Sequence, residues 1–200
     1  MPAAANFQGY AIVQCSFRYA HGYAYVGRMT PKVDFDLVAT IAERRPDWHW
    51  VLVGPVLLDG AGQAEAEALA KTHWQRCKQL PNVHFLGNKH HSELPAYMSH
   101  VDVNTMCYRA EGGWWVTGSP LKLYEYLAVG QPIVGTPLAA VTDFGHVVAL
   151  ARGVDPWTAA IEHALTQGGV GTREDRLACA AVNSWDHRLV ELNTWLSALD

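Results

Sequence analysis

Two ionisable side chains, Lys122 and Glu125, stand in the otherwise apolar and aromatic stretch SPLKLYEYLAVGQPIVGTP at residues 119–137. The stretch has the pattern of a helix, and Lys122 would lie in its first turn. A cation is unfavourable there, because the aligned peptide dipoles place partial positive charge at a helix N-terminus. A bound phosphate would remove that penalty, since the free N–H groups and the ammonium would bind it together. Glu125 could then accept hydrogen bonds from vicinal hydroxyls of the same ligand, as acidic residues do for ribose in dinucleotide-binding folds.

The limits of this helix are marked by residues with strong positional preferences. Ser119 suits the N-cap, and Pro120 suits the first helical position, where a missing N–H is not needed. Gly130 fits the position that follows the helix, and Pro132 prevents continuation. Four residues at helical spacing are predicted to face the sheet: Leu121, Tyr124, Leu127 and Ala128. The simpler alternative for Lys122 and Glu125 is a solvated ion pair worth about 0.2–0.5 kcal/mol.

Short apolar runs alternate with amphipathic segments along the rest of the chain. Strands are predicted at 23–27, 48–55, 82–87, 101–108, 131–136 and 147–150, and helices at 33–46, 63–80, 92–100, 119–129 and from Asp155 to the C-terminus. This alternation predicts an α/β fold, namely a Rossmann-like, doubly wound parallel sheet with helices on both faces. Ligands in such sheets bind beyond the carboxyl ends of the strands. The loops expected to carry a site follow Val26, Val53, Phe85, Met106 and Val134.

The composition limits the class of protein. The chain has 200 residues, a net charge of −4 and 17% charged residues, which fits one globular domain and argues against nucleic acid as a partner. Its four cysteines form no CxxC pair and are interpreted as reduced thiols of a cytoplasmic protein. No apolar run reaches the roughly 20 residues of a membrane span, and a signal peptide is not expected. Residues 1–22 fit no element and are interpreted as a lead-in or linker to one domain at 23–200.

The stretch from Pro120 to Ile133 resembles the nucleotide-sugar-binding motif of GT-B glycosyltransferases of the broad group-1 class. The motif, Pro-x-Lys-x-x-Glu-x-x-Ala-x-Gly-x-Pro-hydrophobic, is met by Pro120, Lys122, Glu125, Ala128, Gly130, Pro132 and Ile133. The stretches YVGRM, LPNVHFLGNKHHSELPAYMSHVDV and NSWDHR are similar to other parts of the same family, so the resemblance covers about residues 23–199. It implies a single Rossmann-like domain, one half of a GT-B enzyme, which binds a nucleotide-sugar donor. UDP is the usual nucleotide in that group.

The resemblance also implies roles for individual residues. The donor diphosphate would be held by Arg28, Ser119, Leu121 and Lys122, with Lys32 as an approximate match to a second basic position. Glu125 would bind the donor ribose. Leu86, Gly87, Asn88 and Lys89 would frame the base, and Gly27, Gly54 and Gly118 would let the backbone approach the ligand. Because basic side chains and the helix dipole handle the phosphate charge in this fold, no metal and no other cofactor is expected.

Two departures from the family pattern limit what the resemblance implies. Retaining members carry an earlier Glu eight positions before the second, where this chain has Thr117, with Glu111 further upstream. Similar sequences with one Glu include inverting enzymes of exopolysaccharide assembly, such as glucuronosyltransferases, so the stereochemistry stays open.

The second departure is length, because the chain resembles only the C-terminal, donor-binding half of a GT-B enzyme. The general base and the site for a glycan, lipid-linked or other acceptor are expected in an N-terminal GT-B domain or a separate subunit. The isolated chain is therefore expected to bind donor without transferring sugar. The full enzyme is expected in the cytoplasm, with peripheral association at the inner face of the membrane as a further option.

Two other classes compete with this interpretation. An NAD-type dehydrogenase domain needs a GxGxxG turn after the first strand, and VGRMTPKVDF has a single Gly there. A non-catalytic α/β module for nucleotide binding or scaffolding would explain why the sequence offers few candidate catalytic residues. It stays open as the alternative. A nucleotide response at residues 118–125 is expected for the donor-binding domain and not for a scaffold.

Overall fold

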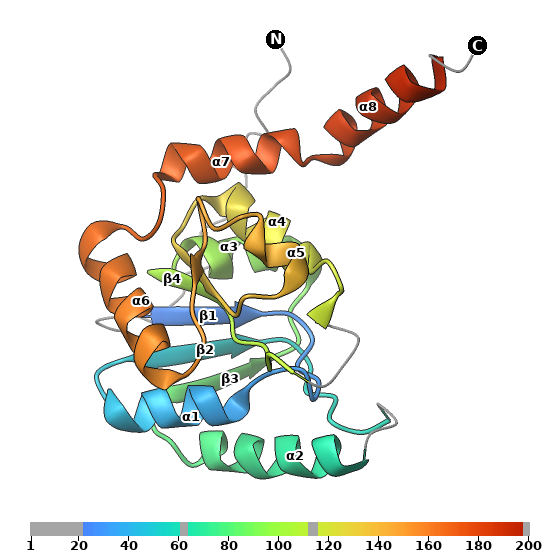
Figure 1. Ribbon diagram of the computed structural model, residues 1–200. Coiled ribbons are helices and arrows are strands. Elements are labelled where there is room, and N and C mark those ends of the chain that lie inside the picture. Colours follow the sequence, from blue (N-terminus) through green and yellow to red (C-terminus); the bar gives the residue numbers. More distant parts are fainter. Residues whose placement is uncertain (1–21, 61–63, 112–115, 198–200) are drawn as a thin grey trace.

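The computed structural model describes residues 22–60, 64–111 and 116–197. Within them, six strands form one sheet in the order β3-β2-β1-β4-β5-β6, and every neighbouring pair is parallel (Figure 1). The strands are β1 (Gly22–Val26), β2 (His49–Val53), β3 (Val83–Gly87), β4 (Val103–Met106), β5 (Ile133–Gly135) and β6 (Ala149–Leu150). The chain first moves outward from β1 to β3 and then crosses back to β4. This reversal is the topological switch point, where such sheets bind ligands. The predicted doubly wound parallel sheet is confirmed.

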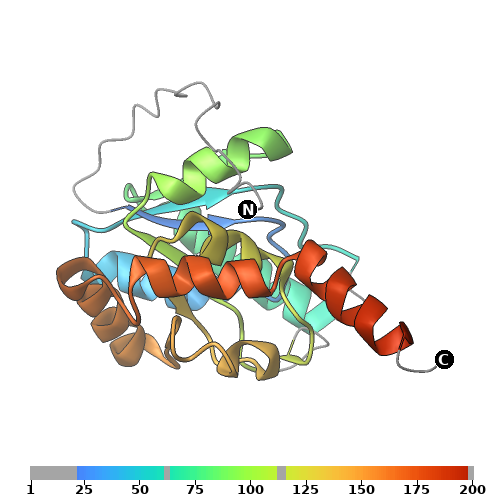
Figure 2. The same cartoon turned by 90° about the horizontal axis from the view of Figure 1, so that it is seen from above.

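The helices cover both faces of this sheet. They are α1 (Phe35–Arg44), α2 (Ala64–Lys78), the short 3₁₀ helix η2 (His91–Glu93), α3 (Leu94–Ser99), α4 (Leu121–Val129), α5 (Ala139–Thr142), α6 (Val154–Gln167), α7 (Arg173–Val182) and α8 (Trp185–Ser197). α1 packs against α2 and α6, whereas α3 packs against β1 and α4. Viewed from above, α3 and α1 lie on opposite sides of the strands, and α7 lies across α4 (Figure 2).

Large aromatic side chains fix β1 against β2. The ring of Tyr23 lies 5.1 Å from that of Trp48 and 5.7 Å from that of Trp50, and all three side chains are inaccessible to solvent. Asn82 ties this layer to α1, because its amide donates to the carbonyls of Ala42 (2.9 Å) and Trp48 (2.8 Å). The two strands end level with each other, and their last residues are register partners. Their following loops therefore start at one edge.

Two details differ from the sequence-based predictions. Gly22 belongs to β1, where it pairs with His49, so the strand begins within the predicted lead-in. Residues 1–21 lie outside the described part of the chain, and the lead-in stays a prediction. The short helix α5 lies in a segment predicted as a loop. It spans four residues, which is too short for a helical period to show in the sequence.

Helix α8 leaves the body of the domain toward the C-terminus (Figure 1). None of its residues is buried. Its large apolar side chains are exposed to an unusual degree: Trp185 is 73% accessible, Leu189 53%, Val190 64%, Leu192 46%, Trp195 69% and Leu196 54%. Contiguous apolar exposure of this kind is typical of a surface that contacts a partner.

Candidate functional site

Three glycines end the three strands on one side of the switch point, β1, β2 and β3. Gly27 follows β1, Gly54 follows β2, and Gly87 closes β3, with φ of 131°, 132° and 67°. The N–H of Gly27 donates to Val53 O (2.8 Å), and the N–H of Gly54 donates to Gly87 O (2.8 Å). A Cβ on Gly54 would lie 2.3 Å from the carbonyl oxygen of Gly27. The backbone itself therefore requires glycine at positions 27, 54 and 87, while the predicted close approach of a ligand at Gly27, Gly54 and Gly118 stays a prediction.

Helix α4 begins directly beyond this edge, one residue later than predicted. Pro120, and not Ser119, occupies the N-cap, and no side chain of the described residues caps the helix. The hydroxyl of Ser119 lies 3.5 Å from that of Tyr124 instead. Proline has no side-chain acceptor, so the first N–H groups of α4, on Leu121 and Lys122, have no partner within the helix. An uncapped terminus of this kind favours an anion through both its N–H groups and its dipole.

The buried face of α4 also differs from the prediction. Leu123, Tyr126 and Leu127 are buried, whereas Leu121 is 68% exposed. The reason is a hydrogen bond from the N–H of Val26 to the hydroxyl of Tyr126, 2.8 Å long, which docks the helix on the end of β1. Lys122 precedes Tyr126 by one helical turn and lies on the same side of the helix. The docking therefore brings Lys122 to the end of β1.

Lys122 is the most unusual side chain of the site. The residue as a whole is half-buried, but its Nζ is inaccessible and has no hydrogen-bond partner among the described residues. The ammonium lies 3.4 Å from the ring centroid of Tyr25 and 5.4 Å from that of Tyr108. Burial, and then the charge of Lys32, hold the pKa of Lys122 well below its usual value. The alternative of a solvated Lys122–Glu125 ion pair is not what the structure contains.

Two further cations surround the end of β1. Arg28 follows Gly27 and is exposed, and its carbonyl accepts a hydrogen bond from the hydroxyl of Tyr25 (3.2 Å). Lys32 is half-buried, with its Nζ 5.4 Å from the ring centroid of Tyr108. Burial and the charge of Arg28 lower the pKa of Lys32. The structure thus brings together the three basic residues that were assigned to one diphosphate, and the pKa values of the two lysines are lowered first by burial and then by the neighbouring positive charge.

Glu125 is half-buried beside this cluster. Its charge contributes to the pKa of Lys122, Tyr108 and Tyr126, which places it within electrostatic reach of all three. Glu125 makes no hydrogen bond or ion pair to a described residue. Its carboxylate therefore keeps its acceptor capacity for a ligand, as the ribose assignment requires, and that assignment stays a prediction.

The segment assigned to the base lies at the same edge, two strands away from β1. Leu86 and Gly87 end β3, and Asn88 follows them in an exposed position. The Nζ of Lys89 lies 6.0 Å from the ring centroid of Tyr97 in α3. Gly118 is half-buried before the start of α4. All predicted contact residues thus lie along one edge, while their contacts to a ligand stay predictions.

The position of the missing first Glu is also defined. Thr117 is exposed close to the start of α4. Glu111, further upstream, is exposed and pairs with Arg152 at 2.6 Å. The intervening residues 112–115, which include two tryptophans, lie outside the described chain. Between Glu111 and Glu125 the sequence contains no other Asp or Glu.

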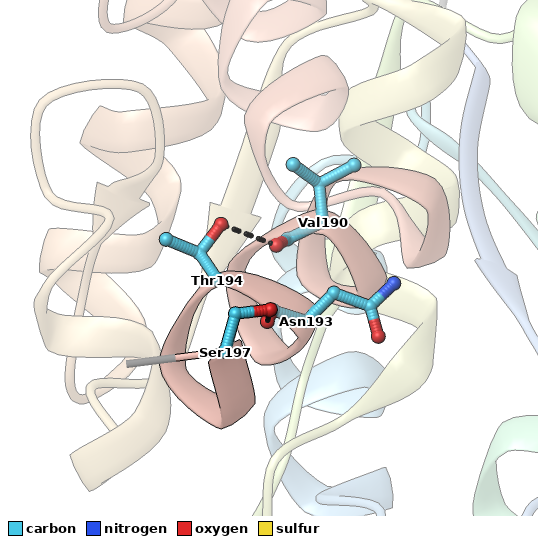
Figure 3. A pocket seen from close by; sticks show the side chains of 4 residues that line it. All are labelled: Val190, Asn193, Thr194 and Ser197. Carbon is cyan, nitrogen blue, oxygen red and sulfur yellow. Dashed lines mark hydrogen bonds between the residues drawn. The ribbon is translucent and has the colours of Figure 1, made fainter. Parts of the chain in front are cut away.

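Two hollows elsewhere lack these properties. One lies along α8 and is lined by Val190, Asn193, Thr194 and Ser197, all from a single helix (Figure 3). The hydroxyls of Thr194 and Ser197 are bonded to backbone carbonyls of the same helix, so they do not point to a ligand. The other hollow, of about 190 Å³, lies between the start of α1 and α2 and includes Asp34, Asp36, His73 and Arg109. Neither joins a helix N-terminus to a buried cation.

Tyr25 and Tyr108, which surround the Lys122 ammonium, were not among the predicted site residues. Their rings meet edge to face, with centroids 6.2 Å apart and planes at 88°. Burial raises the pKa of both hydroxyls. In the sequence both residues fit the apolar patterns of their strands, and only the contact between the ends of β1 and β4 shows their relation to Lys122. The one feature of the sequence that could have indicated a site role was the position of Tyr25 directly before the Val-Gly-Arg turn.

Comparisons with known proteins agree with this geometry. TuaH of Bacillus subtilis (strain 168), named for a glycosyltransferase role in teichuronic acid biosynthesis, is 32% identical over 167 residues, which is 81% of this chain and 39% of TuaH. HepE of Anabaena in complex with UDP has a TM-score of 0.67 at 16% identity, over 88% of this chain and 48% of HepE. An E. coli trehalose-6-phosphate protein bound with UDP-2-fluoro glucose has a TM-score of 0.62 at 17% identity, over 84% of this chain and 42% of that one.

These relatives carry different kinds of information. The two solved structures are too distant in sequence to show more than a shared fold. This chain spans less than half the length of TuaH, HepE and the E. coli protein. The profile of the family described as Glycosyl transferases group 1 matches residues 20–167, which is most of the chain. On this match and on the identity to TuaH, the chain belongs to the group 1 glycosyltransferase family.

Proposed function

We propose that this chain is the donor-binding half of a glycosyltransferase and that its donor is a nucleotide-sugar, with UDP as the favoured nucleotide. The observation that carries the proposal is the Lys122 ammonium. It is inaccessible, lacks a hydrogen-bond partner in the described chain, and lies at the uncapped start of α4. A site that keeps a cation in this state is incomplete without an anion. The choice of UDP is supported by the UDP bound to HepE and the UDP-sugar analogue bound to the E. coli protein.

The proposed contacts follow from the charges and free backbone groups of the site. Lys122, Arg28 and Lys32 would neutralise the diphosphate, and the N–H groups of Leu121 and Lys122 would donate to it. Ser119 lies at the same terminus and is exposed. Glu125 would accept hydrogen bonds from the ribose hydroxyls. Leu86, Gly87, Asn88 and Lys89 would frame the base, with Gly27, Gly54 and Gly118 allowing close approach.

These groups also suit the chemistry of glycosyl transfer. The bond between the anomeric carbon and the diphosphate oxygen breaks, and the nucleoside diphosphate leaves with the bonding electrons. Cations and helix N–H groups that are already in place stabilise the charge that develops on this leaving group. The acceptor oxygen bonds to the anomeric carbon, and its proton passes to a base outside this chain. With Thr117 in place of the earlier Glu, retention and inversion both stay open, and no metal or other cofactor is required.

The acceptor and the base are proposed to come from an N-terminal GT-B domain or a separate subunit. Support comes from the lengths of the relatives and from α8, whose apolar side chains have no cover in the described chain. Among the helices of the described ranges, none combines the length and the hydropathy of a membrane span. The proposed setting is the cytoplasm, with peripheral association of the full enzyme at the inner face of the membrane as a further option.

A thermal-shift panel of UDP-, GDP-, ADP- and TDP-sugars tests the proposed donor. A ligand at 100 times its Kd adds about 2.7 kcal/mol to the free energy of unfolding. For a domain of this size that corresponds to a rise in Tm of about 5–10 °C. The uridine series is expected to give the largest shift. A panel without any shift would favour the alternative of a scaffold module.

Two variants then test the site itself. Lys122→Ala and Glu125→Ala are each expected to weaken UDP binding at least about tenfold, because each removes a charge-assisted hydrogen bond. Calorimetric titration measures both affinities directly. Lys78→Ala, on an exposed part of α2, is the matched control and should bind like the wild type. Unchanged affinity in both site variants would show that UDP binds elsewhere.

A further inference from the structure

The ammonium of Lys122 lacks the usual stabilisation of a buried cation. It has no carboxylate partner and no hydrogen bond in the described chain. A side chain with four rotatable bonds could place such a group in water, as lysines generally do. The Nζ instead lies over the face of Tyr25, 3.4 Å from the ring centroid. The aromatic ring is therefore the group that holds the cation in place.

The tyrosine pair, Tyr25 and Tyr108, is itself held by contacts with each other and with the backbone. The two rings pack edge to face, and the hydroxyl of Tyr25 donates to the carbonyl of Arg28. The ring of Tyr108 lies between two cations, with the Nζ of Lys32 and the Nζ of Lys122 each 5.4 Å from its centroid. The two rings thus contact the Nζ atoms of Lys122 and Lys32, and the Tyr25 hydroxyl binds the backbone of Arg28.

We propose that Tyr25 and Tyr108 are positioning residues that hold the Lys122 ammonium at the strand edge before the nucleotide arrives. The identity of the ligand in this inference rests on the proposed function. The positioning itself does not, because it describes the chain without a ligand.

An aromatic partner has an advantage that a carboxylate would not have. The negative face of a ring attracts an ammonium, with about 2 kcal/mol or more when the pair is desolvated. The ring carries no net charge, so it neutralises none of the positive charge that the diphosphate would meet. A carboxylate in the same place would neutralise Lys122 and repel the ligand. The tyrosine pair therefore orients the cation without competing for it.

The surroundings of Lys122 on every side support this interpretation. Lys32 and Arg28 come from the segment after β1, Cys107 and Tyr108 follow β4, and Glu125 lies on α4 itself. Burial raises the pKa of the Cys107 thiol to about 12, so this group is neutral. Glu125 is the one anionic side chain among them, and it makes no ion pair with Lys122.

The tyrosine pair has a consequence for pH. Lys122 has a lowered pKa in the free protein, and a bound diphosphate would raise it again. Nucleotide affinity should therefore fall as pH rises above the pKa of free Lys122, by up to about tenfold per pH unit. Removing the ring face lowers that pKa further, so the fall should begin at lower pH.

The test uses two substitutions at the same position. Tyr25→Phe keeps the ring and loses the hydroxyl, with its hydrogen bonds to the carbonyl of Arg28 and to the side chain of Tyr108. Tyr25→Leu loses the ring face as well. UDP affinity is measured by calorimetry from pH 7.5 to 10 for both variants and the wild type. Tyr25→Leu is expected to bind about tenfold more weakly, with the pH of half-maximal affinity shifted down by about one unit. Tyr25→Phe should remain within about threefold and keep the wild-type pH profile.

A direct readout separates this inference from the proposed function. The pKa of Lys122 is followed by NMR of its Cε and Nζ without nucleotide, with Lys122→Ala to assign the signal. A lower pKa in Tyr25→Leu and an unchanged pKa in Tyr25→Phe would support the positioning role even if UDP does not bind. Equal pKa values in all three proteins would overturn it. If Tyr25→Leu does not fold, as judged by circular dichroism, Tyr108→Leu is measured with the same expected direction.

A double-mutant cycle excludes a purely structural effect. If Tyr25 acts through Lys122, Tyr25→Leu should cost no further UDP affinity in a Lys122→Ala background. Full additivity of the two losses would mean that Tyr25 only supports the fold, and the inference would fail. Absence of UDP binding by a folded wild-type chain would instead refute the proposed function.

Discussion

Replacement of Lys122 by methionine is expected to stabilise the protein and to weaken nucleotide binding. Methionine has a similar length, contacts aromatic rings favourably and carries no charge. In the wild type, withdrawal of the ammonium from water, with no hydrogen-bond partner in the described chain, costs several kcal/mol. Contact with Tyr25 offsets about 2 kcal/mol of this cost. The expected net gain for Lys122→Met is about 1–2 kcal/mol, or a rise in Tm of about 2–8 °C.

The gain should depend on pH with a defined sign. The pKa of Lys122 is depressed in the folded protein, first by burial and then by Lys32, whereas its value in the unfolded chain is about 10.4. Between these two values the unfolded state binds more protons, so wild-type stability rises with pH. The stability cost of the buried ammonium is fully present at pH values below the pKa of Lys122 in the folded protein. The advantage of Lys122→Met should therefore be largest at neutral pH and should shrink toward pH 10.

Urea denaturation followed by tryptophan fluorescence, without nucleotide, measures both effects. Wild type and Lys122→Met are compared at pH 7 and pH 9.5, and equal m-values are required before the free energies are compared. Lys78→Met is the control, since Lys78 is exposed. Its Nζ lies 4.7 Å from the ring centroid of Trp74, so its replacement should cost up to about 1 kcal/mol, by the same amount at either pH. A Lys122→Met protein less stable than the wild type, or a difference independent of pH, would refute the view that Lys122 is buried at a cost.

Three further substitutions test other parts of the site. Gly54→Ala should destabilise the protein by about 3 kcal/mol in urea denaturation, because φ of Gly54 is 132° and the added Cβ would lie 2.3 Å from Gly27 O. A loss of stability below about 1 kcal/mol would contradict the need for glycine at this turn. Tyr126→Phe should cost about 1–3 kcal/mol in the same assay, since the buried N–H of Val26 loses its 2.8 Å acceptor, and full stability would mean that α4 is docked by other contacts. Glu125→Gln should reduce the preference for UDP over 2′-deoxy-UDP in calorimetry, while an unchanged preference would remove Glu125 from the ribose contact.

The fold was largely predictable because its strands and helices each carry a clear period. Turn residues such as Gly130 and Pro132 marked the end of the predicted motif helix correctly. The buried face of α4 was not predictable in the same way. Its sequence has apolar or aromatic residues on two sides, and both Leu121 and Leu123 fit a core position. The hydrogen bond between Tyr126 and Val26, which joins segments far apart in the chain, decides between them.

The candidate site was predictable in part for a similar reason. The misplaced charge of Lys122 in a first turn was visible in the sequence and indicated an anion site. The sequence did not show that the Nζ of Lys122 is inaccessible or that it contacts Tyr25, because both depend on how the ends of β1 and β4 meet. Ser119 had the right chemistry for an N-cap, but Pro120 takes that position and leaves the terminus open. The open terminus strengthens the proposed anion site.

The central claim is that the diphosphate binds at the start of α4 on Lys122. Calorimetric titration of the chain with UDP, UMP and uridine, in the wild type and in Lys122→Ala, tests it most directly. Each charge-assisted hydrogen bond contributes about 1.5–3 kcal/mol, so UDP should bind the wild type at least about 100-fold more tightly than uridine, with UMP between them. Lys122→Ala should reduce this ratio at least about tenfold. Equal affinities for UDP and uridine, or a ratio unchanged in Lys122→Ala, would contradict the claim.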